Sequence, residues 1–203
     1  MFTAVAQSSK RCTPTEYLRL EEKATERHEY DAGEILAMSG GTFEHSQITL
    51  NAGATFRDAL RGKPSQPLDS NMKVRMVERD KYVYPDVTIV CGPPEFDVDD
   101  AKRTTIVNPT VIVEVLSLST ENYDRGRKFE AYRTLPSLRE YVLISQWEPL
   151  VDTFSRNADG LWTISTFRGM DTVVDLPSLS IKIPLRELYL NVVFQPRPAP
   201  PEE

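Results

Sequence analysis

The segment "NPTVIVEVLSLST" (residues 108–120) decides the fold, because one charged residue interrupts an otherwise apolar run. From Val111 to Leu116 every residue except Glu114 is valine, isoleucine or leucine. A short continuous apolar run predicts a strand that is buried on both faces of a sheet. Burying a carboxylate there costs roughly several kcal/mol unless something pairs with it. Glu114 is therefore either paired structurally or used chemically.

A second apolar segment, "VYPDVTIVCG" (residues 83–92), carries Asp86 in the same way. Alternate side chains of a strand share a face, which groups Glu114 with Ile112 and Leu116. If the two strands are neighbours, Asp86 and Glu114 converge at one end of the sheet. Two close carboxylates repel each other unless a proton or a cation lies between them. Oxygen ligands without cysteine favour Mg²⁺ or Mn²⁺ over zinc.

The segment after Glu114 supplies a positive group. In "DRGRKFEAYR" (residues 124–133), Lys128 and Tyr132 are four residues apart and share a helical face. A helix that starts just after the Glu114 strand can return Lys128 over the strand ends. Two carboxylates, a divalent cation and a lysine make a site for phosphodiester hydrolysis, in which the cation activates water and the ammonium steadies the phosphate.

Composition predicts one globular domain. The chain has 203 residues, of which 40% are hydrophobic and 27% charged. We expect a flexible leader at 1–12, a single domain at 13–193 and a disordered proline-rich tail at 194–203. The apolar runs are too short for a membrane helix, and the N-terminus has no signal-peptide core, so we expect a cytoplasmic protein without membrane contact. Two isolated cysteines argue against a zinc site or a disulfide framework.

The order of expected elements predicts a mixed α/β fold, a sheet flanked by helices with additional β-hairpins. In the first half we expect a helix from the capping signals of 13–24, a hairpin at 28–39, a helix ending at Gly62, and strands at 71–77 and 81–90. A loop at 91–109 then leads to the Glu114 strand and to a helix within 119–137 that stops before Pro136. The last elements are a strand at 140–145, a hairpin at 150–167, and a short strand with a closing helical turn at 175–190.

The chain also resembles a known family. "PD" at Pro85–Asp86, "VEVLS" at 113–117 and "YDRGRKFEAYRTLPSLREYVLI" at 123–144 resemble the PD-(D/E)XK nuclease superfamily. Within it they resemble the Uma-two-type family of restriction-endonuclease-like proteins, which is frequent in bacteria. The likeness covers nearly the whole chain, and the block from Asp86 to Tyr141 is its most specific part.

This resemblance implies a restriction-endonuclease-like fold, a Mg²⁺ site and nuclease chemistry. Asp86 and Glu114 would be metal ligands. The usual motif places lysine two residues after the glutamate, where this chain has Leu116. That departure disables the standard site unless Lys128 replaces the lysine from the helix, as the family's D-x-x-x-K pattern suggests.

Further residues have two readings each. Glu29 falls on a family motif and is either a metal ligand or an ordinary hairpin residue. His45 also falls on a family motif and is either an accessory group of the site or a residue that caps or packs near the start of its helix. Tyr132 is either accessory to the site or a core residue whose hydroxyl reaches a neighbour. Arg125 and Arg127 either bind the phosphate backbone or form a solvated helix face. A local basic rim would reconcile a nucleic-acid substrate with the net charge of −6.

Three functions remain open on this basis. The first is a Mg²⁺-dependent endonuclease that cleaves DNA, working as a homodimer that addresses both strands. The second is a catalytically inactive nuclease fold that serves as a binding or oligomerisation module, which Leu116 and the acidic balance favour. The third is metal-assisted hydrolysis of a small phosphoester, which needs only the same carboxylates.

Overall fold

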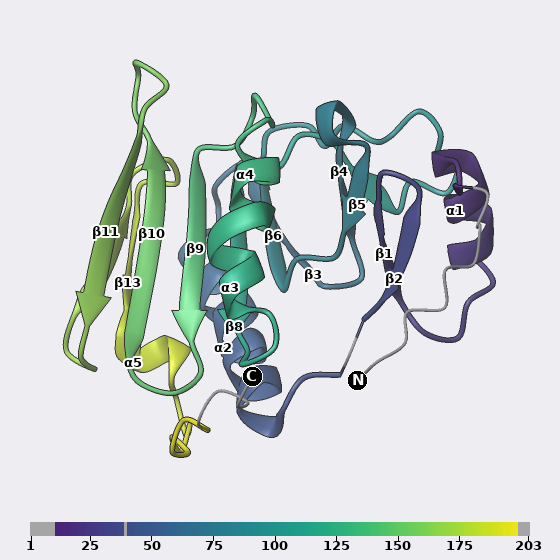
Figure 1. Ribbon diagram of the computed structural model, residues 1–203. Coiled ribbons are helices and arrows are strands. Elements are labelled where there is room, and N and C mark those ends of the chain that lie inside the picture. The colour runs from purple at the N-terminus through teal and green to yellow at the C-terminus, as the bar shows by residue number, and fades with distance from the viewer. Residues whose placement is uncertain (1–10, 39, 199–203) are drawn as a thin grey trace.

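The structure is a computed structural model that describes residues 11–38 and 40–198. Three β-sheets and a few helices make up a mixed α/β architecture, as predicted (Figure 1). The strand orders are β11-β10-β9-β8-β6-β3 in the six-stranded sheet, β2-β1-β5-β4-β7 in the five-stranded sheet and β12-β13 in the smallest sheet. No helix in the described ranges is long and apolar enough to cross a membrane.

The six-stranded sheet forms the centre of the molecule. Its strands are β3 (Ser65–Asp69), β6 (Val87–Cys91), β8 (Val111–Leu116), β9 (Glu140–Ser145), β10 (Leu150–Arg156) and β11 (Trp162–Arg168). The sheet is mixed, because β8 pairs in parallel with β9 and antiparallel with β6. Every residue of β8 is buried, so the predicted two-sided burial of this strand is confirmed. Strand β3 was not predicted from the sequence.

Helices cover both faces of β8 (Figure 1). On one face Val111, Val113 and Val115 share a core cluster with Ile48, Ala52 and Phe56 of α2 (Phe43–Ala59). On the other face Ile112 and Leu116 pack with side chains of the segment that follows β8. The four-residue spacing of the α2 core residues explains why this stretch is helical. The predicted helix is confirmed, and it ends three residues before Gly62.

The five-stranded sheet lies beside the first. Its strands are β1 (His28–Asp31), β2 (Glu34–Ala37), β4 (Lys73–Met76), β5 (Lys81–Val83) and β7 (Thr105–Ile106), with a short 3₁₀ turn η1 (Val77–Arg79) before β5. The predicted hairpin is confirmed: β1 and β2 pair antiparallel around Ala32 and Gly33, whose positive φ angles of 46° and 99° suit a tight turn. The predicted first helix, α1 (Pro14–Glu21), carries the expected capping box between Thr13 and Glu16.

Two predictions about chain breaks were wrong. Residues 81–90 were expected as one strand, but Tyr84–Asp86 separate β5 from β6, and the two strands belong to different sheets. Pro85 has no N–H to donate to a ladder, which explains the break. The C-terminal part contains a hairpin rather than one strand, with β12 (Val173–Leu176), β13 (Ile181–Pro184) and then the helical turn α5 (Leu185–Leu188).

The segment after β8 is helical but irregular. It consists of α3 (Glu121–Tyr123), the π-helical turn η2 (Asp124–Lys128) and α4 (Phe129–Tyr132), and it stops before Pro136 as predicted. The sequence predicts one regular helix here, so the irregularity is a difference. Single π-helical turns inside helices are rare and occur often at functional sites. The first and last residues of this turn both belong to the charged cluster described below.

Most of the predicted leader, residues 1–10, and the end of the predicted tail, residues 199–203, lie outside the described residues. The beginning of the tail contacts the domain. The ring of Phe194 lies 5.2 Å from that of Tyr189, and an Nη2 atom of Arg197 lies 2.6 Å from Glu121 Oε2. These contacts attach residues 194–197 to Tyr189 after α5 and to Glu121 of α3.

Candidate active site

Strand pairing places the two predicted carboxylates together. In the antiparallel ladder of β6 and β8, Val87 stands opposite Val113. Asp86 directly precedes β6, so the same register sets it opposite Glu114. Its Oδ2 atom accepts a hydrogen bond of 2.7 Å from the backbone N–H of Val115. The two strands are therefore neighbours and present both carboxylates at one end of the sheet, as the sequence analysis expected.

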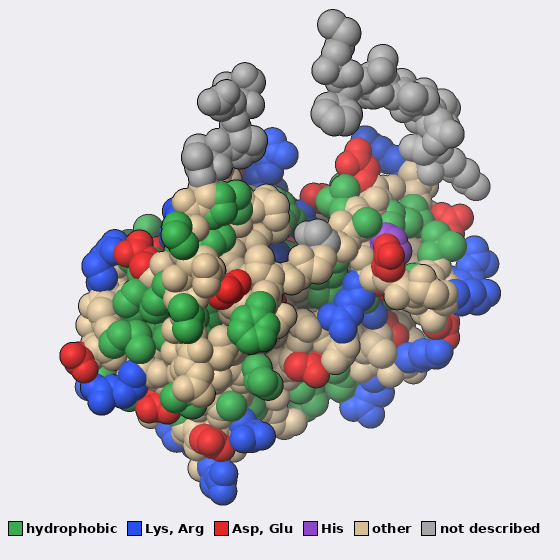
Figure 2. Space-filling view, turned by 90° about the horizontal axis from the view of Figure 1, so that it is seen from below, with side chains coloured by type: hydrophobic (Ala, Val, Ile, Leu, Met, Phe, Trp, Pro, Cys, Tyr) green, Lys and Arg blue, Asp and Glu red, His purple; other side chains and the backbone are tan. Residues whose placement is uncertain are grey.

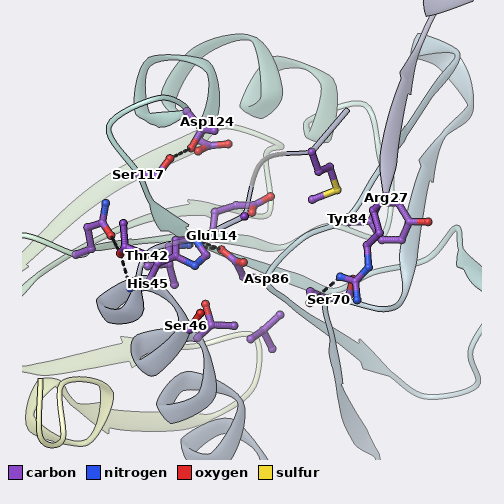
Figure 3. A pocket seen from close by; sticks show the side chains of 18 of the residues that line it. Arg27, Thr42, His45, Ser46, Ser70, Tyr84, Asp86, Glu114, Ser117 and Asp124 are labelled. Carbon is purple, nitrogen blue, oxygen red and sulfur yellow. Dashed lines mark hydrogen bonds and ion pairs between the residues drawn. The ribbon is translucent and has the colours of Figure 1, made fainter. Parts of the chain in front are cut away.

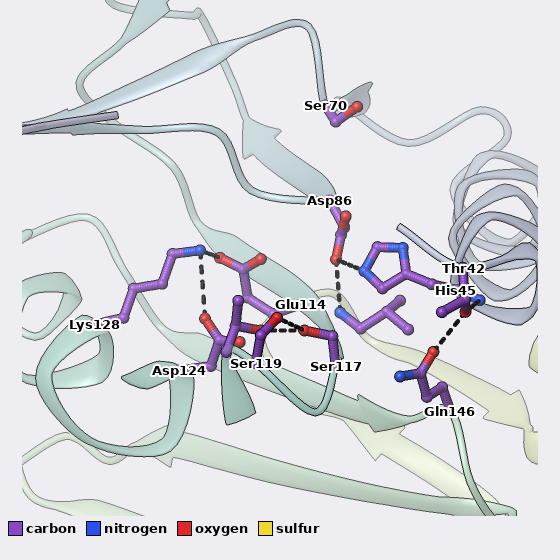
Figure 4. Close-up of polar contacts among 12 residues, drawn as sticks. Thr42, His45, Ser70, Asp86, Glu114, Ser117, Ser119, Asp124, Lys128 and Gln146 are labelled. Carbon is purple, nitrogen blue, oxygen red and sulfur yellow. Dashed lines mark hydrogen bonds and ion pairs between the residues drawn. The ribbon is translucent and has the colours of Figure 1, made fainter. Parts of the chain in front are cut away.

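Lys128 reaches Glu114 from the helical segment, as Figure 4 shows, and Tyr132 of the same segment contacts Glu114 as well. The Nζ atom of Lys128 lies 2.8 Å from Glu114 Oε1. The hydroxyl of Tyr132, one helical turn later, donates to the same oxygen at 2.8 Å. The side chains of Glu114 and Lys128 are only 5% and 7% exposed. The predicted helical face thus exists, and it forms a buried ion pair with the strand.

Two further carboxylates surround the same lysine. Asp124 Oδ1 lies 3.4 Å from Lys128 Nζ, and Glu29 Oε1 lies 3.7 Å from it. Glu29 comes from β1 of the neighbouring sheet, so both sheets contribute to the cluster. Asp124 was not assigned a role from the sequence, although its position four residues before Lys128 in the D-x-x-x-K pattern was the available signal.

His45 approaches Asp86 from the first turn of α2. Its Nε2 atom lies 3.4 Å from Asp86 Oδ2. The hydroxyl of Thr42, at the N-cap of α2, accepts from the backbone N–H of His45 and donates to Gln146 Oε1 at 2.9 Å. These contacts fix the start of the helix and hence the imidazole. Thr42 and Gln146 were not predicted, because nothing in the sequence connects two residues so far apart in the chain.

Burial and mutual repulsion govern the charges of the cluster. Burial, with Asp124 and Asp86 nearby, raises the pKa of Glu114 to about 8 in spite of Lys128. Burial also raises the pKa of Asp124. Burial disfavours the charge of Lys128, but the surrounding carboxylates outweigh this effect and raise its pKa. For His45 burial is likewise outweighed by Asp86, so its pKa is raised.

The cluster forms part of the wall of a large cavity of about 1410 Å³ (Figure 3). The other walls come from the β1–β2 hairpin, from α2 and from the loop after β8. The predicted residues that line it are Glu29, His45, Asp86, Glu114 and Lys128. Tyr132 is fully buried behind Glu114 and does not line the cavity. Asp124 lines it as well.

Arg125 and Arg127 lie elsewhere. Arg125 binds Glu121 at 3.0 Å and Asp152 at 2.7 Å, and Arg127 is exposed. Neither residue lines the cavity, and their contact with a phosphate backbone stays a prediction. Figure 2 shows one face of the molecule on which Lys and Arg side chains lie among acidic and apolar ones instead of forming one continuous patch.

The donor set of the cavity wall matches the chemistry of a hard divalent cation. Asp86, Glu114 and Asp124 offer carboxylate oxygens, and Asp124 Oδ1 is buried with the Lys128 ammonium 3.4 Å away. In residues 11–38 and 40–198 no three His, Cys, Asp or Glu side chains form a ready-made metal cage. Mg²⁺ sites commonly use only one or two carboxylates and retain several waters, so this donor set fits such an ion.

Comparison with known proteins places the chain in a family. A family model, Uma2, described as "Putative restriction endonuclease", matches residues 14–186. The chain belongs to the Uma2 family. The matched residues of this Uma2 protein include every candidate site residue named above.

Two relatives of this Uma2 protein come from Synechocystis (strain PCC 6803). "Uncharacterized protein slr1290" is 36% identical over 183 residues, covering 90% of this chain and 93% of its own. "Uncharacterized protein sll1609" is 32% identical over 177 residues, covering 87% and 99%.

A solved structure supports the fold. The crystal structure of a protein described as a "putative nuclease belonging to DUF820" from Anabaena variabilis is similar with a TM-score of 0.67 and 15% identity. The similarity covers 85% of this chain and 97% of that one. At this identity the likeness shows the fold alone, and the restriction-endonuclease-like architecture predicted from the sequence is confirmed.

Proposed function

We propose that this Uma2 protein is a Mg²⁺-dependent endonuclease that hydrolyses phosphodiester bonds in DNA. The family and the fold support a nuclease in general. One observation supports the metal dependence and the DNA substrate: Asp86, just before β6, and Glu114, on the paired strand β8, line one cavity, and the Lys128 ammonium lies 2.8 Å from Glu114. Clustered titratable groups with raised pKa values in a cavity are typical of catalytic sites.

Each residue has a role in this reaction. Asp86 and Glu114 hold Mg²⁺ or Mn²⁺, with Glu29 as a further carboxylate at the same cavity. The bound cation supplies activation of water and neutralisation of developing charge. Lys128 contacts the scissile phosphate and stabilises its charge in the transition state. Tyr132 fixes the orientation of Glu114 through its 2.8 Å hydrogen bond.

Lys128 can replace the lysine that this chain lacks at the usual position of the motif. Leu116, where the motif has lysine, is buried in the apolar cluster between β8 and α4 and offers no charge. Lys128 brings an ammonium to Glu114 from the helical segment instead. Glu114, with Glu29 and Asp124, keeps this ammonium protonated, because the three carboxylates stabilise its charge. A positively charged group at the phosphate is therefore available without the lysine of the usual motif.

Calorimetry with Mg²⁺ and Mn²⁺, combined with cleavage of plasmid and oligonucleotide DNA, tests the proposal. The wild type should bind the cation and cut, whereas Glu114→Gln and Asp86→Asn should lose both properties while melting cooperatively. Metal binding that is equal in all three proteins would exclude these carboxylates as ligands. We also propose that the protein is a homodimer, and light scattering on the same samples tests this.

The alternative, a catalytically inactive module, rests on a specific contact. Lys128 and Tyr132 already satisfy Glu114 Oε1, so a cation has to compete with an existing ion pair and hydrogen bond. If calorimetry shows no metal binding and no DNA is cut, the cluster is a structural ion-pair network and the module function takes precedence.

A further inference from the structure

The reacting groups lie inside the cavity rather than on an open surface. Glu114 and Lys128 are almost completely buried, and the cavity above them measures about 1410 Å³. Pockets for small molecules are usually about 300–1,000 Å³. A phosphodiester bond must therefore enter a large, deep space in order to meet these side chains. A paired strand can enter it only together with its complement.

The charge of the cavity wall does not suit a duplex. Six acidic residues line it, against three basic ones, Arg27, Arg57 and Lys128. Proteins that bind duplex DNA through its backbone neutralise many phosphates with lysine and arginine. With so few cations, affinity for a nucleic acid has to come from contacts with something other than phosphate.

Apolar side chains supply such contacts at the cavity. Leu36 on β2, Leu50 on α2 and Leu118 after β8 line it and are exposed. Trp147 lines it too, next to Gln146. The indole Nε1 of Trp147 has no hydrogen-bond partner among the described residues, so packing alone positions the ring. Unpaired bases expose flat faces that can stack on an aromatic ring such as that of Trp147, a contact worth about 1–3 kcal/mol per base, whereas paired bases hide these faces.

A cation lies on the other side of the carboxylates. Figure 3 shows Arg27, near Tyr84 and Ser70, on the opposite side of Asp86 and Glu114 from Thr42. The Arg27 guanidinium donates to the carbonyl oxygen of Ser70 at 2.8 Å, to the Ser70 hydroxyl at 3.2 Å and, through Nη2, to Asn71 Oδ1. A guanidinium has five N–H donors, so Arg27 keeps donors for a phosphate. A strand that passes over the carboxylates would reach it.

We propose that the cavity takes an unpaired DNA strand. One phosphate lies at Glu114 and Lys128, a neighbouring base packs against Trp147, and a flanking phosphate binds Arg27. The substrate is then single-stranded DNA, or a single-stranded region within a duplex, rather than paired DNA. This inference rests on the proposed nuclease function, which it makes more specific.

Tryptophan fluorescence tests the binding without relying on cleavage. The chain contains two tryptophans, so Trp162→Phe leaves Trp147 as the sole indole reporter. In EDTA, which prevents cutting, a 12-nucleotide single strand should quench this fluorescence. A hairpin duplex with the same sequence should need about tenfold higher concentration, in line with the loss of one stacking contact. Equal quenching by both would overturn the inference, and so would no quenching by either.

Cleavage kinetics separate this inference from the proposed function. With Mg²⁺, single-stranded DNA should be cut with a kcat/KM about tenfold above that of the duplex. Trp147→Ala should raise KM for the single strand about tenfold with little change in kcat, and Trp147→Phe should restore most of it. Trp162→Phe is the matched control. Arg27→Gln should weaken binding and reduce its dependence on salt.

The possible outcomes are distinct. Preferential cutting of duplex DNA overturns the single-strand inference and leaves the nuclease function standing. Quenching by the single strand without any cutting overturns the nuclease function and leaves the strand-binding cavity standing. An unchanged KM in Trp147→Ala removes the stacking contact from the proposal.

Discussion

Two buried glutamates on adjacent strands of the same sheet have different surroundings. Glu114 on β8 and Glu140 on β9 are 4% and 1% exposed. Parallel pairing sets Glu140 beside Val111, so it lies on the opposite face from Glu114. Hydroxyls of Ser155 and Ser178 donate to Glu140, and in the described part of the chain it has no ion pair. Burial raises its pKa, as it does for Glu114.

The difference shows what a buried carboxylate alone can indicate. Glu140 is accounted for by two neutral donors, does not line the large cavity, and has no cation to work with. Glu114 has a lysine, further carboxylates and a cavity in contact with it. Burial and a raised pKa are common to both, so the cluster and the cavity, not the burial, identify the candidate site.

Removing each carboxylate should give the largest contrast. Glu114→Gln should lower DNA cleavage on the order of 1,000-fold, because loss of a metal ligand removes several kcal/mol of charge stabilisation. Glu140→Gln should leave cleavage within about twofold, since it lies on the other face of the sheet. Steady-state cleavage of a fluorescent oligonucleotide measures both. Comparable losses in the two variants would mean that the sheet, rather than the cluster, is sensitive to charge changes.

Lys128 should show the next largest effect. Lys128→Met keeps much of the side-chain volume and removes the ammonium, so kcat should fall about 100-fold through lost stabilisation of the phosphate. Lys182→Met, at an exposed position of β13, is the matched control and should not change kcat. Calorimetry should show that Lys128→Met still binds Mg²⁺. Loss of metal binding together with activity would instead make Lys128 a support for the carboxylates.

The two glutamates also show which parts of the site could be predicted from the sequence. The sequence predicted that Glu114 and Asp86 converge at one end of the sheet if their strands are neighbours. The register of β6 and β8 shows that they are. Glu140 went unnoticed because it begins its strand, where a polar residue is unremarkable. The spacing of four residues could have paired Asp124 with Lys128, whereas nothing in the sequence indicates the π-helical turn that contains both. Strand β3 was not predicted because it contains Pro67, which is unfavourable inside a sheet. The strand tolerates this proline because it lies at the edge of the sheet.

Stability should depend on pH through Glu114 in the metal-free protein. Its pKa of about 8 in the folded protein lies above the ordinary glutamate value of 4.5, so the folded state binds the proton more tightly. The resulting stabilisation is present below about pH 4.5 and is lost as the pH rises through about 8. Glu114→Gln should therefore melt at a higher temperature than the wild type at pH 9, with a smaller difference at pH 5.

Adding Mg²⁺ to the same melting experiment distinguishes a glutamate that binds the cation from one that is only buried. Saturating Mg²⁺ should raise the melting temperature of the wild type and of Glu140→Gln at pH 8, because binding to the folded state stabilises it. It should leave Glu114→Gln unchanged. Differential scanning fluorimetry over pH 5–9 gives all three profiles. A rise in Glu114→Gln equal to that of the wild type would place the cation elsewhere.

The smallest effect concerns the hydroxyls around Glu140. Ser178→Ala removes one donor from a buried carboxylate, which should cost about 1–3 kcal/mol of unfolding free energy, since hydrogen bonds to charged groups exceed neutral ones. Urea denaturation measures this loss, and cleavage of DNA should not change. If Ser178→Ala is neutral for stability, Glu140 is held in its protonated form at the working pH and needs its neighbours less than Glu114 does. Because the pKa of Glu114 is also raised, to about 8, the two glutamates would then differ less in charge than in the lysine, the carboxylates and the cavity around Glu114.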